Sequence, residues 1–99
     1  MGQPIISFVA AKWTDAWYQL SKEEQDSLMA KIRAHREEAG IHVKNVIIYR
    51  ALDASWDWIV VDEYPDIETI QRLEDLDAEV NWRRYWAGAS VIGTRREAS

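Results

Sequence analysis

The sequence predicts an α+β domain in which a four-stranded antiparallel sheet has two helices on one face. The chain has 99 residues, which fits a single domain over 1–99. Apolar, β-branched segments lie near both ends of the chain and as a pair in its middle. Two stretches with helical spacing of apolar residues separate these segments. The resulting order is β-α-β-β-α-β, and right-handed crossovers place both helices on the same side of the sheet.

The first strand is expected at Ile5–Trp13, where both alternating sets of residues are largely apolar, so both faces should be covered. A connection with room for a helical turn follows. The first helix should begin after Ser21, because Ser21 and Glu24 have the spacing of a capping box. It should reach about Ala39, with Gly40 as the glycine that ends it.

The middle of the chain is typical of a β-hairpin. Val43–Leu52 and Trp56–Tyr64 are rich in β-branched residues, and a short polar connection joins them. Pro65 then ends the strand, and Asp66 is a suitable N-cap for the second helix. The last strand is expected over about 89–95.

Composition excludes several classes of function. The net charge is −5 with a pI near 4.9, and no basic stripe is present, so nucleic acid is not an expected partner. The absence of cysteine excludes disulfides and thiolate catalysis. No apolar run approaches the ~20 residues of a membrane span, so no membrane partner is expected. The first residues lack a signal-peptide pattern, and a cytoplasmic location is therefore expected.

Six tryptophans against one phenylalanine are the unusual feature of the composition. Between Asn81 and Trp86 the chain reads Asn-Trp-Arg-Arg-Tyr-Trp, and helical spacing would put Trp82, Tyr85 and Trp86 on one face. The apolar stripe of the preceding helix lies about half a turn away. Either the helix breaks near Asp77–Glu79, or this end is covered on two sides. Both alternatives place aromatic rings at a second surface, such as a pocket or a subunit contact.

Three segments resemble the dimeric α+β barrel superfamily, and more closely its small uncharacterised bacterial members. They are Trp17-x-x-Leu20-x-x-Glu23-Glu24, Val60–Asp66 and the aromatic segment Asn81–Trp86. The resemblance implies a homodimer in which two sheets pack together and cover the apolar second face of each. It also implies a ligand cleft between the helices and the sheet, near the end of the second helix.

The superfamily includes cofactor-independent oxygenases, polyketide cyclases, lactone isomerases and haem-degrading enzymes. In such a cleft, stacked rings would hold a flat hydrophobic ligand, and amide and indole N–H groups would hold a carbonyl or enolate oxygen. The alternative is that the rings are core or dimer contact. The candidate substrate-binding residues are Tyr49, Trp58, Asn81, Trp82, Tyr85 and Trp86.

His42 and Asp62 are the candidate catalytic residues. An unperturbed imidazole titrates at about pH 6.5, which makes His42 a possible base, although a lone histidine at a strand start is often structural. Asp62 shares a strand face with Trp58 and Tyr64, and an acid in an apolar cleft can act as a general base. Asp62 could instead pair with Arg50 or another arginine, or lie exposed.

Neither a cofactor nor a metal is expected. Haem needs an axial ligand, usually histidine in the haem-degrading enzymes, and the second helix has none. His35 lies among charged residues of the first helix, where a solvated face is expected. The acidic run Glu74–Glu79 has the same interpretation, and two isolated histidines without cysteine lack the spacing of a zinc site.

Two hypotheses therefore stand. The first is a small enzyme that needs no metal or organic cofactor and oxygenates, isomerises or cyclises a flat hydrophobic molecule that bears oxygen. The second is a non-catalytic dimeric binding or assembly module whose tryptophans seal the interface.

Overall fold

The computed structural model describes residues 4–40 and 46–96. The elements are β1 (Ile5–Trp13), α1 (Asp15–Tyr18), α2 (Lys22–Glu38), β2 (Val46–Arg50), β3 (Trp58–Tyr64), α3 (Ile67–Ala78), the 3-10 helix η2 (Trp82–Arg84) and β4 (Trp86–Thr94).

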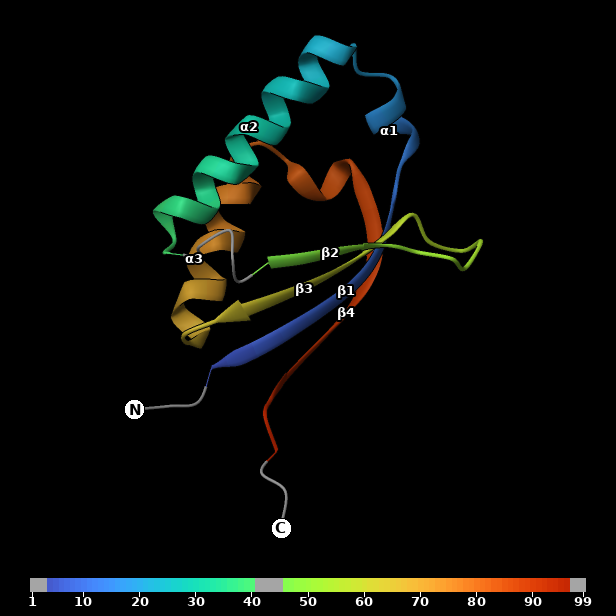
Figure 1. Cartoon of the computed structure of the whole chain (residues 1–99). Coiled ribbons are helices and arrows are strands. Elements are labelled where there is room, and N and C mark those ends of the chain that lie inside the picture. Colours follow the sequence, from blue (N-terminus) through green and yellow to red (C-terminus); the bar gives the residue numbers. More distant parts are fainter. Residues whose placement is uncertain (1–3, 41–45, 97–99) are drawn as a thin grey trace.

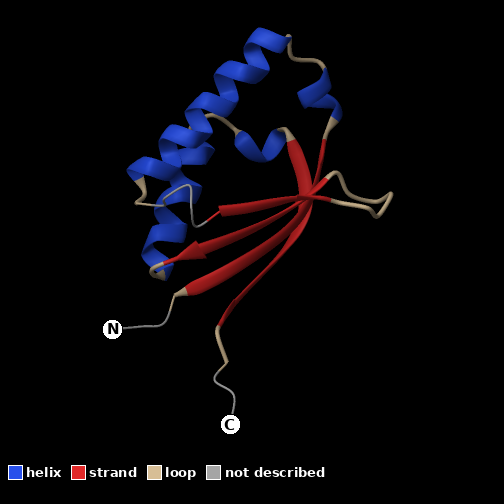
Figure 2. Cartoon of the chain, viewed as in Figure 1, coloured by secondary structure: helices blue, strands red, loops and turns tan. Residues whose placement is uncertain are grey.

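The strands form one four-stranded antiparallel sheet in the order β2-β3-β1-β4. The helices lie on one side of this sheet, and its other face is open (Figures 1 and 2). Each helix therefore connects two strands that are not neighbours in the sheet, which is the ferredoxin-like α+β arrangement. The predicted fold class is confirmed. Within the described ranges, no helix is long and apolar enough to cross a bilayer.

The predicted helix boundaries are confirmed by their caps. The Ser21 hydroxyl accepts the Glu24 backbone N–H at 3.1 Å, and the Glu24 carboxylate accepts the Ser21 N–H at 2.9 Å. Gly40 has a φ of 86°, which favours glycine and turns the chain away from the helix axis. At α3, the Asp66 carboxylate accepts the Thr69 N–H at 2.8 Å. Local side-chain chemistry therefore sets where both helices start.

The central hairpin forms as predicted but is shorter. β3 begins at Trp58, two residues later than expected, and the side chain of Asp57 accepts the backbone N–H of Trp13 at 3.0 Å. Trp56 belongs to the turn, where its N–H donates to the Asp53 carbonyl. The start of β2 is Val46, and the predicted residues 43–45 lie outside the described ranges.

The prediction for the last strand is wrong at its start. β4 begins at Trp86 rather than at 89 or 90, because Trp86 pairs with Trp13 across the sheet and Gly88 pairs with Ala11. A Cβ at Gly88 would lie 2.4 Å from the carbonyl oxygen of Ala10 on β1. The strand therefore needs glycine here in order to approach its neighbour.

The two sheet faces differ in burial along the central strand β1, whereas Ile48 and Ile92 of the outer strands are exposed on the helix side. On the helix side, Ile5, Ser7 and Ala11 of β1 are buried. On the open side, Phe8 is 47% exposed and Val91, its partner on β4, is 70% exposed. Further large side chains that are exposed on the open side are those of Ile47 and Tyr49. The apolar second face that the sequence predicts is present, and in the single chain it is uncovered.

The best-buried part of the core lies between the sheet and the end of the helical layer where α2 finishes and α3 begins. Its members come from β1, β2, β3, α3 and the residue that caps the C-terminus of α2. They are Ile5, Tyr64 and Leu73, with Ala39, Val46 and Ile70 packed against them.

Candidate functional site

The aromatic segment 81–86 does not form one helical face. α3 ends at Ala78, Asn81 takes a left-handed conformation with φ of 53°, and a short 3-10 turn follows before Trp86 enters the sheet. The first of the two alternatives, a helix break, is therefore confirmed, although the helical grouping of Trp82, Tyr85 and Trp86 is wrong. Pairing with β1 overrides the helical period at Trp86.

Four tryptophans pack together where α1 and η2 meet the helix side of the sheet. The rings of Trp13 and Trp17 are stacked with centroids 3.8 Å apart, and Trp58 is 4.4 Å from Trp13. Trp82 meets Trp13 and Trp17 edge-on at 5.9 and 6.4 Å. Of the four, Trp17 is buried, and the other three are half-buried. Of the predicted site residues, Trp58 and Trp82 belong to this tryptophan cluster, whereas Trp13 and Trp17 were not predicted. Their spacing of four residues is the signal that could have indicated them.

Trp86 lies apart from the tryptophan cluster. The Arg83 guanidinium covers its ring at 4.8 Å from the centroid, a cation–π contact. The indole N–H of Trp86 is buried and has no hydrogen-bond partner within the described part of the chain. Backbone and side-chain bonds from Thr14 to the carbonyls of Tyr85 and Arg84, at 3.0 and 2.7 Å, tie this segment to the end of β1.

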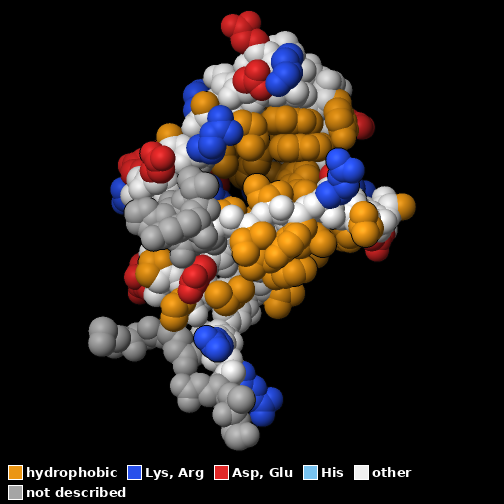
Figure 3. Space-filling model, viewed as in Figure 1, with side chains coloured by type: hydrophobic (Ala, Val, Ile, Leu, Met, Phe, Trp, Pro, Cys, Tyr) orange, Lys and Arg blue, Asp and Glu red, His pale blue; other side chains and the backbone are white. Residues whose placement is uncertain are grey.

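The two long helices are joined at one end. His35 Nδ1 lies 3.0 Å from Asp77 Oδ1, and the Arg72 guanidinium donates to Glu38 at 3.3 Å. Both pairs link the C-terminal half of α2 to α3. Toward its N-terminal end α2 rises away from the sheet and from α3 (Figure 1). The space-filling view shows hydrophobic side chains gathered in a hollow below that end of α2 (Figure 3).

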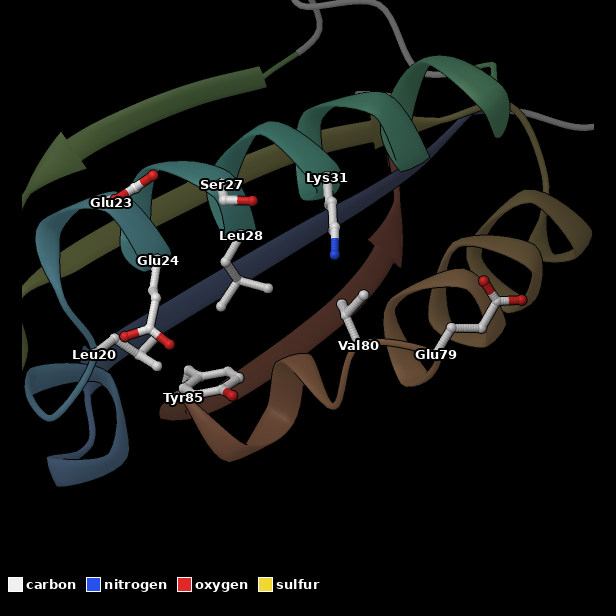
Figure 4. A pocket seen from close by; sticks show the side chains of 9 residues that line it. All are labelled: Leu20, Glu23, Glu24, Ser27, Leu28, Lys31, Glu79, Val80 and Tyr85. Atoms are coloured by element: carbon white, nitrogen blue, oxygen red, sulfur yellow. The ribbon is translucent and has the colours of Figure 1, made fainter.

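A hollow of about 530 Å³ opens between the N-terminal half of α2 and the segment that follows the end of α3. Figure 4 shows its walls, formed by the N-terminal half of α2 and by the segment from the end of α3 to Tyr85. Leucine, valine and tyrosine side chains supply apolar surface, and a serine, a lysine and three carboxylates complete the lining. The residues are Leu20, Glu23, Glu24, Ser27, Leu28, Lys31, Glu79, Val80 and Tyr85.

Tyr85 is the predicted site residue that lines this hollow. Asn81 is exposed at the left-handed turn, and Tyr49 lies on the open face of the sheet, away from the helices. The structure therefore distributes the predicted substrate-binding residues over several places. Leu28 and Lys31 of α2 were not predicted as site residues, and nothing in their local sequence distinguishes them from other helix positions.

Asp62 is buried on the helix side of β3 and is engaged on both oxygens. Its Oδ1 accepts from the Arg36 guanidinium of α2, and its Oδ2 accepts from the Tyr64 hydroxyl at 3.0 Å. The alternative of an exposed acid is wrong, and the arginine partner is Arg36, not Arg50. Burial, with the negative charge of Asp62 beside it, raises the pKa of the Tyr64 hydroxyl above its ordinary value.

The expectation of a solvated face is wrong for His35 and for Asp77. Both are largely buried against each other, with 13% and 16% of their side chains exposed. The pKa of the Asp77 carboxyl is raised by its burial, and the hydrogen bond from His35 opposes this rise. The helix contact lies 42 residues away in sequence, so local charge could not indicate it. Glu74, Asp75 and Glu79 are exposed, as expected.

His42, the other candidate base, lies outside the described residues. In the described ranges, no group of three or more histidine, cysteine or acidic residues could hold a metal ion.

No protein-family model and no curated protein matches the chain. Solved structures do match. A variant of chlorite dismutase from Candidatus Nitrospira defluvii superposes with a TM-score of 0.70 at 22% identity, covering 95% of this chain and 41% of that one. Another variant of that enzyme gives a TM-score of 0.72 at 11% identity, with 100% and 43% covered. This chain thus spans less than half the length of the chlorite dismutase chains.

A third match has nearly the same length as this chain. It is SnoaB, described as a cofactor-independent oxygenase from Streptomyces nogalater, with a TM-score of 0.62 at 13% identity. The superposition covers 98% of this chain and 97% of SnoaB. At these identities the likeness establishes the ferredoxin-like α+β fold, which the chain shares with enzymes of two different kinds.

Proposed function

We propose that this protein binds a flat, hydrophobic, oxygen-bearing small molecule in the hollow between α2 and the segment 79–85. The observation that carries the proposal is the hollow of about 530 Å³ between the N-terminal half of α2 and the segment that follows the end of α3 at Ala78. Ligand pockets commonly have volumes of about 300–1,000 Å³ and mostly apolar walls with a few polar groups. Leu20, Leu28, Val80 and Tyr85 provide the apolar part of the walls here, and five polar or charged side chains form the rest.

The proposed activity is oxygenation without a metal or an organic cofactor. It is supported by the likeness to SnoaB over nearly the whole of both chains. In such a reaction a methylene beside a carbonyl loses a proton, and the carbanion donates electrons to O2. The carbon gains one oxygen as a new carbonyl, and its two hydrogens leave with the other oxygen as water. Isomerisation or cyclisation would begin from the same enolate but consume no O2.

His42 and Asp62 remain the proposed proton acceptors. The Asp62 carboxylate is bound by Arg36 and by the Tyr64 hydroxyl, and these bonds compete with its acceptance of a proton from a ligand. His42→Ala is therefore the sharper test, and it should lower turnover while leaving ligand affinity unchanged. An unchanged rate would remove His42 from the mechanism.

A homodimer is part of the proposal. The open sheet face carries exposed Phe8, Ile47, Tyr49 and Val91, and soluble monomers seldom leave contiguous apolar surface of this kind uncovered. A second copy of the sheet would cover it. Light scattering should give twice the monomer mass of 11.5 kDa for the unmodified protein. Phe8→Lys should give the monomer mass, and Tyr18→Lys, which alters an exposed ring on α1, should leave the dimer intact. An unmodified protein that remains monomeric at high concentration would refute this part.

Binding and turnover are tested with a panel of polycyclic phenols and ketones. Quenching of tryptophan fluorescence reports binding, and an oxygen electrode reports turnover. Leu28→Trp should fill the hollow and abolish both signals. Ile67→Trp, at the far end of α3 and exposed, is the matched control and should retain them. Unchanged binding by the Leu28 variant, or no binding by the unmodified protein, would exclude the hollow as the site.

The second candidate is a non-catalytic dimeric binding module. It is favoured by the stacking of Trp13 on Trp17 at 3.8 Å, which leaves no space for a ligand between these rings. Saturable binding without O2 uptake or product would support this candidate over the oxygenase.

A further inference from the structure

We propose that Lys31 binds the acidic oxygen of the ligand, so that the hollow prefers phenols and enols to neutral molecules of the same shape. The inference rests on the proposed function, because it assigns a role inside the same hollow. Among the described residues that line it, Lys31 supplies the one cationic side chain. Its ammonium group extends from α2 into the space between the helices, toward Val80 (Figure 4).

The charge of Lys31 is not neutralised by an ion pair within the described part of the chain. Lys22, on the same helix, pairs with Asp26 at 2.7 Å, whereas Lys31 makes no such contact. An unpaired ammonium beside apolar surface is suited to an anionic ligand group, because a charge-assisted hydrogen bond is stronger than one between neutral partners.

The three carboxylates that line the hollow form no ion pair with Lys31. Glu24 is engaged by the N–H of Ser21, and its hydrogen bonds with Ser21 keep the pKa of its carboxyl below the ordinary value. Figure 4 shows Glu23 pointing away from Leu28, and Glu79 pointing away from Val80. Glu24 also points into the hollow, near Leu20 and Tyr85, so the hollow holds one negative charge there and the positive charge of Lys31 farther along α2 (Figure 4).

The groups around Lys31 fit an amphipathic ligand. Ser27 precedes Lys31 by four residues, so the two share a face of α2. The Tyr85 ring, Leu28 and Val80 provide the apolar surface for the body of the ligand. Binding the ionised oxygen beside an ammonium group lowers the pKa of the ligand hydroxyl, and its proton is released to solvent. Lys31 is thus a positioning residue that holds the enolate or phenolate form.

The experiment compares 2-hydroxyanthraquinone, whose visible absorbance changes on ionisation, with its methyl ether, which cannot ionise. The unmodified protein should lower the pKa of the bound phenol and bind it about ten-fold more tightly than the ether. Lys31→Met should lose this ten-fold preference and the absorbance change while still binding the ether. Lys31→Arg should restore both, and Lys22→Met, which removes an exposed charge on the same helix, should alter neither.

Two results overturn the inference and are distinct from each other. If the unmodified protein binds phenol and ether equally, or if Lys31→Met leaves the ionisation of the bound phenol unchanged, Lys31 has no such role and the proposed binding site stands. If neither compound nor any other member of the panel binds, the proposed function fails, and the role of Lys31 fails with it.

Discussion

The two ends of α2 are attached to the rest of the protein in different ways. At one end, α2 is held by the His35–Asp77 and Glu38–Arg72 pairs and by Arg36 on Asp62, over a core that contains Leu73. At the other end, one neutral hydrogen bond, from the Gln25 side chain to the Trp17 carbonyl at 3.1 Å, links α2 to α1. We call these the joined end and the open end. The comparison indicates that stability resides mainly in the joined end, and the proposed ligand site lies at the open end.

The largest expected change in stability comes from replacing one leucine at each end by alanine. Leu73→Ala, at the joined end, should lower the free energy of unfolding by about 2–5 kcal/mol, because it leaves a cavity in the core. Leu28→Ala, at the open end, should cost less than about 1 kcal/mol, because Leu28 is half-buried and lines an open hollow. Urea unfolding of both variants measures the difference. Equal losses would show that the open end is as much a part of the core as the joined end.

The second prediction tests how closely β4 packs against β1 at Gly88. Gly88→Ala should lower the free energy of unfolding by about 1–3 kcal/mol, because the added Cβ would overlap a backbone carbonyl that cannot move aside. Gly93→Ala, farther along the same strand, meets no atom within 4 Å and should change stability by less than about 0.5 kcal/mol. Thermal melts compare them. A neutral Gly88 variant would mean that β1 and β4 separate easily at this point.

The smallest effect concerns the pH dependence of the joined end. Because burial raises the pKa of Asp77 from 3.8, the folded state binds a proton more tightly than the unfolded state does. This contribution to stability is complete below pH 3.8 and is lost as the pH rises through the folded-state pKa. Asparagine does not titrate, so the Asp77→Asn variant does not lose this contribution. The free energy of unfolding of the variant minus that of the unmodified protein should therefore increase as the pH rises above 3.8.

Urea titrations at several pH values measure this difference. Glu74→Gln, which removes an exposed carboxylate from the same helix, controls for the loss of a negative charge. If the difference between the Asp77 variant and the unmodified protein falls with rising pH, the His35 contact outweighs burial at this site.

The sequence predicts well those features that depend on neighbouring residues. The capping box at Ser21, the glycine stop at Gly40 and the N-cap at Asp66 are each determined within a few positions, and all three are confirmed. Element order then restricts the topology to the observed sheet.

Features set by distant contacts were missed. Trp86 has a helical spacing to Trp82, but its pairing with Trp13 makes it part of a strand. His35 looks solvated among charged residues until α3 brings Asp77 against it. The hollow depends on how α2 lies against the segment that follows α3, which no local pattern encodes, so only Tyr85 of its lining was predicted.

The unequal attachment of α2 has a mechanical consequence. A helix of 17 residues is a rod about 25 Å long. Because α2 is held at its C-terminal end, a rotation of about 5° about that end displaces its first turn by about 2 Å. Under the proposed function, a small tilt of α2 would adapt the hollow to ligands of different thickness without breaking the ion pairs near its C-terminal end.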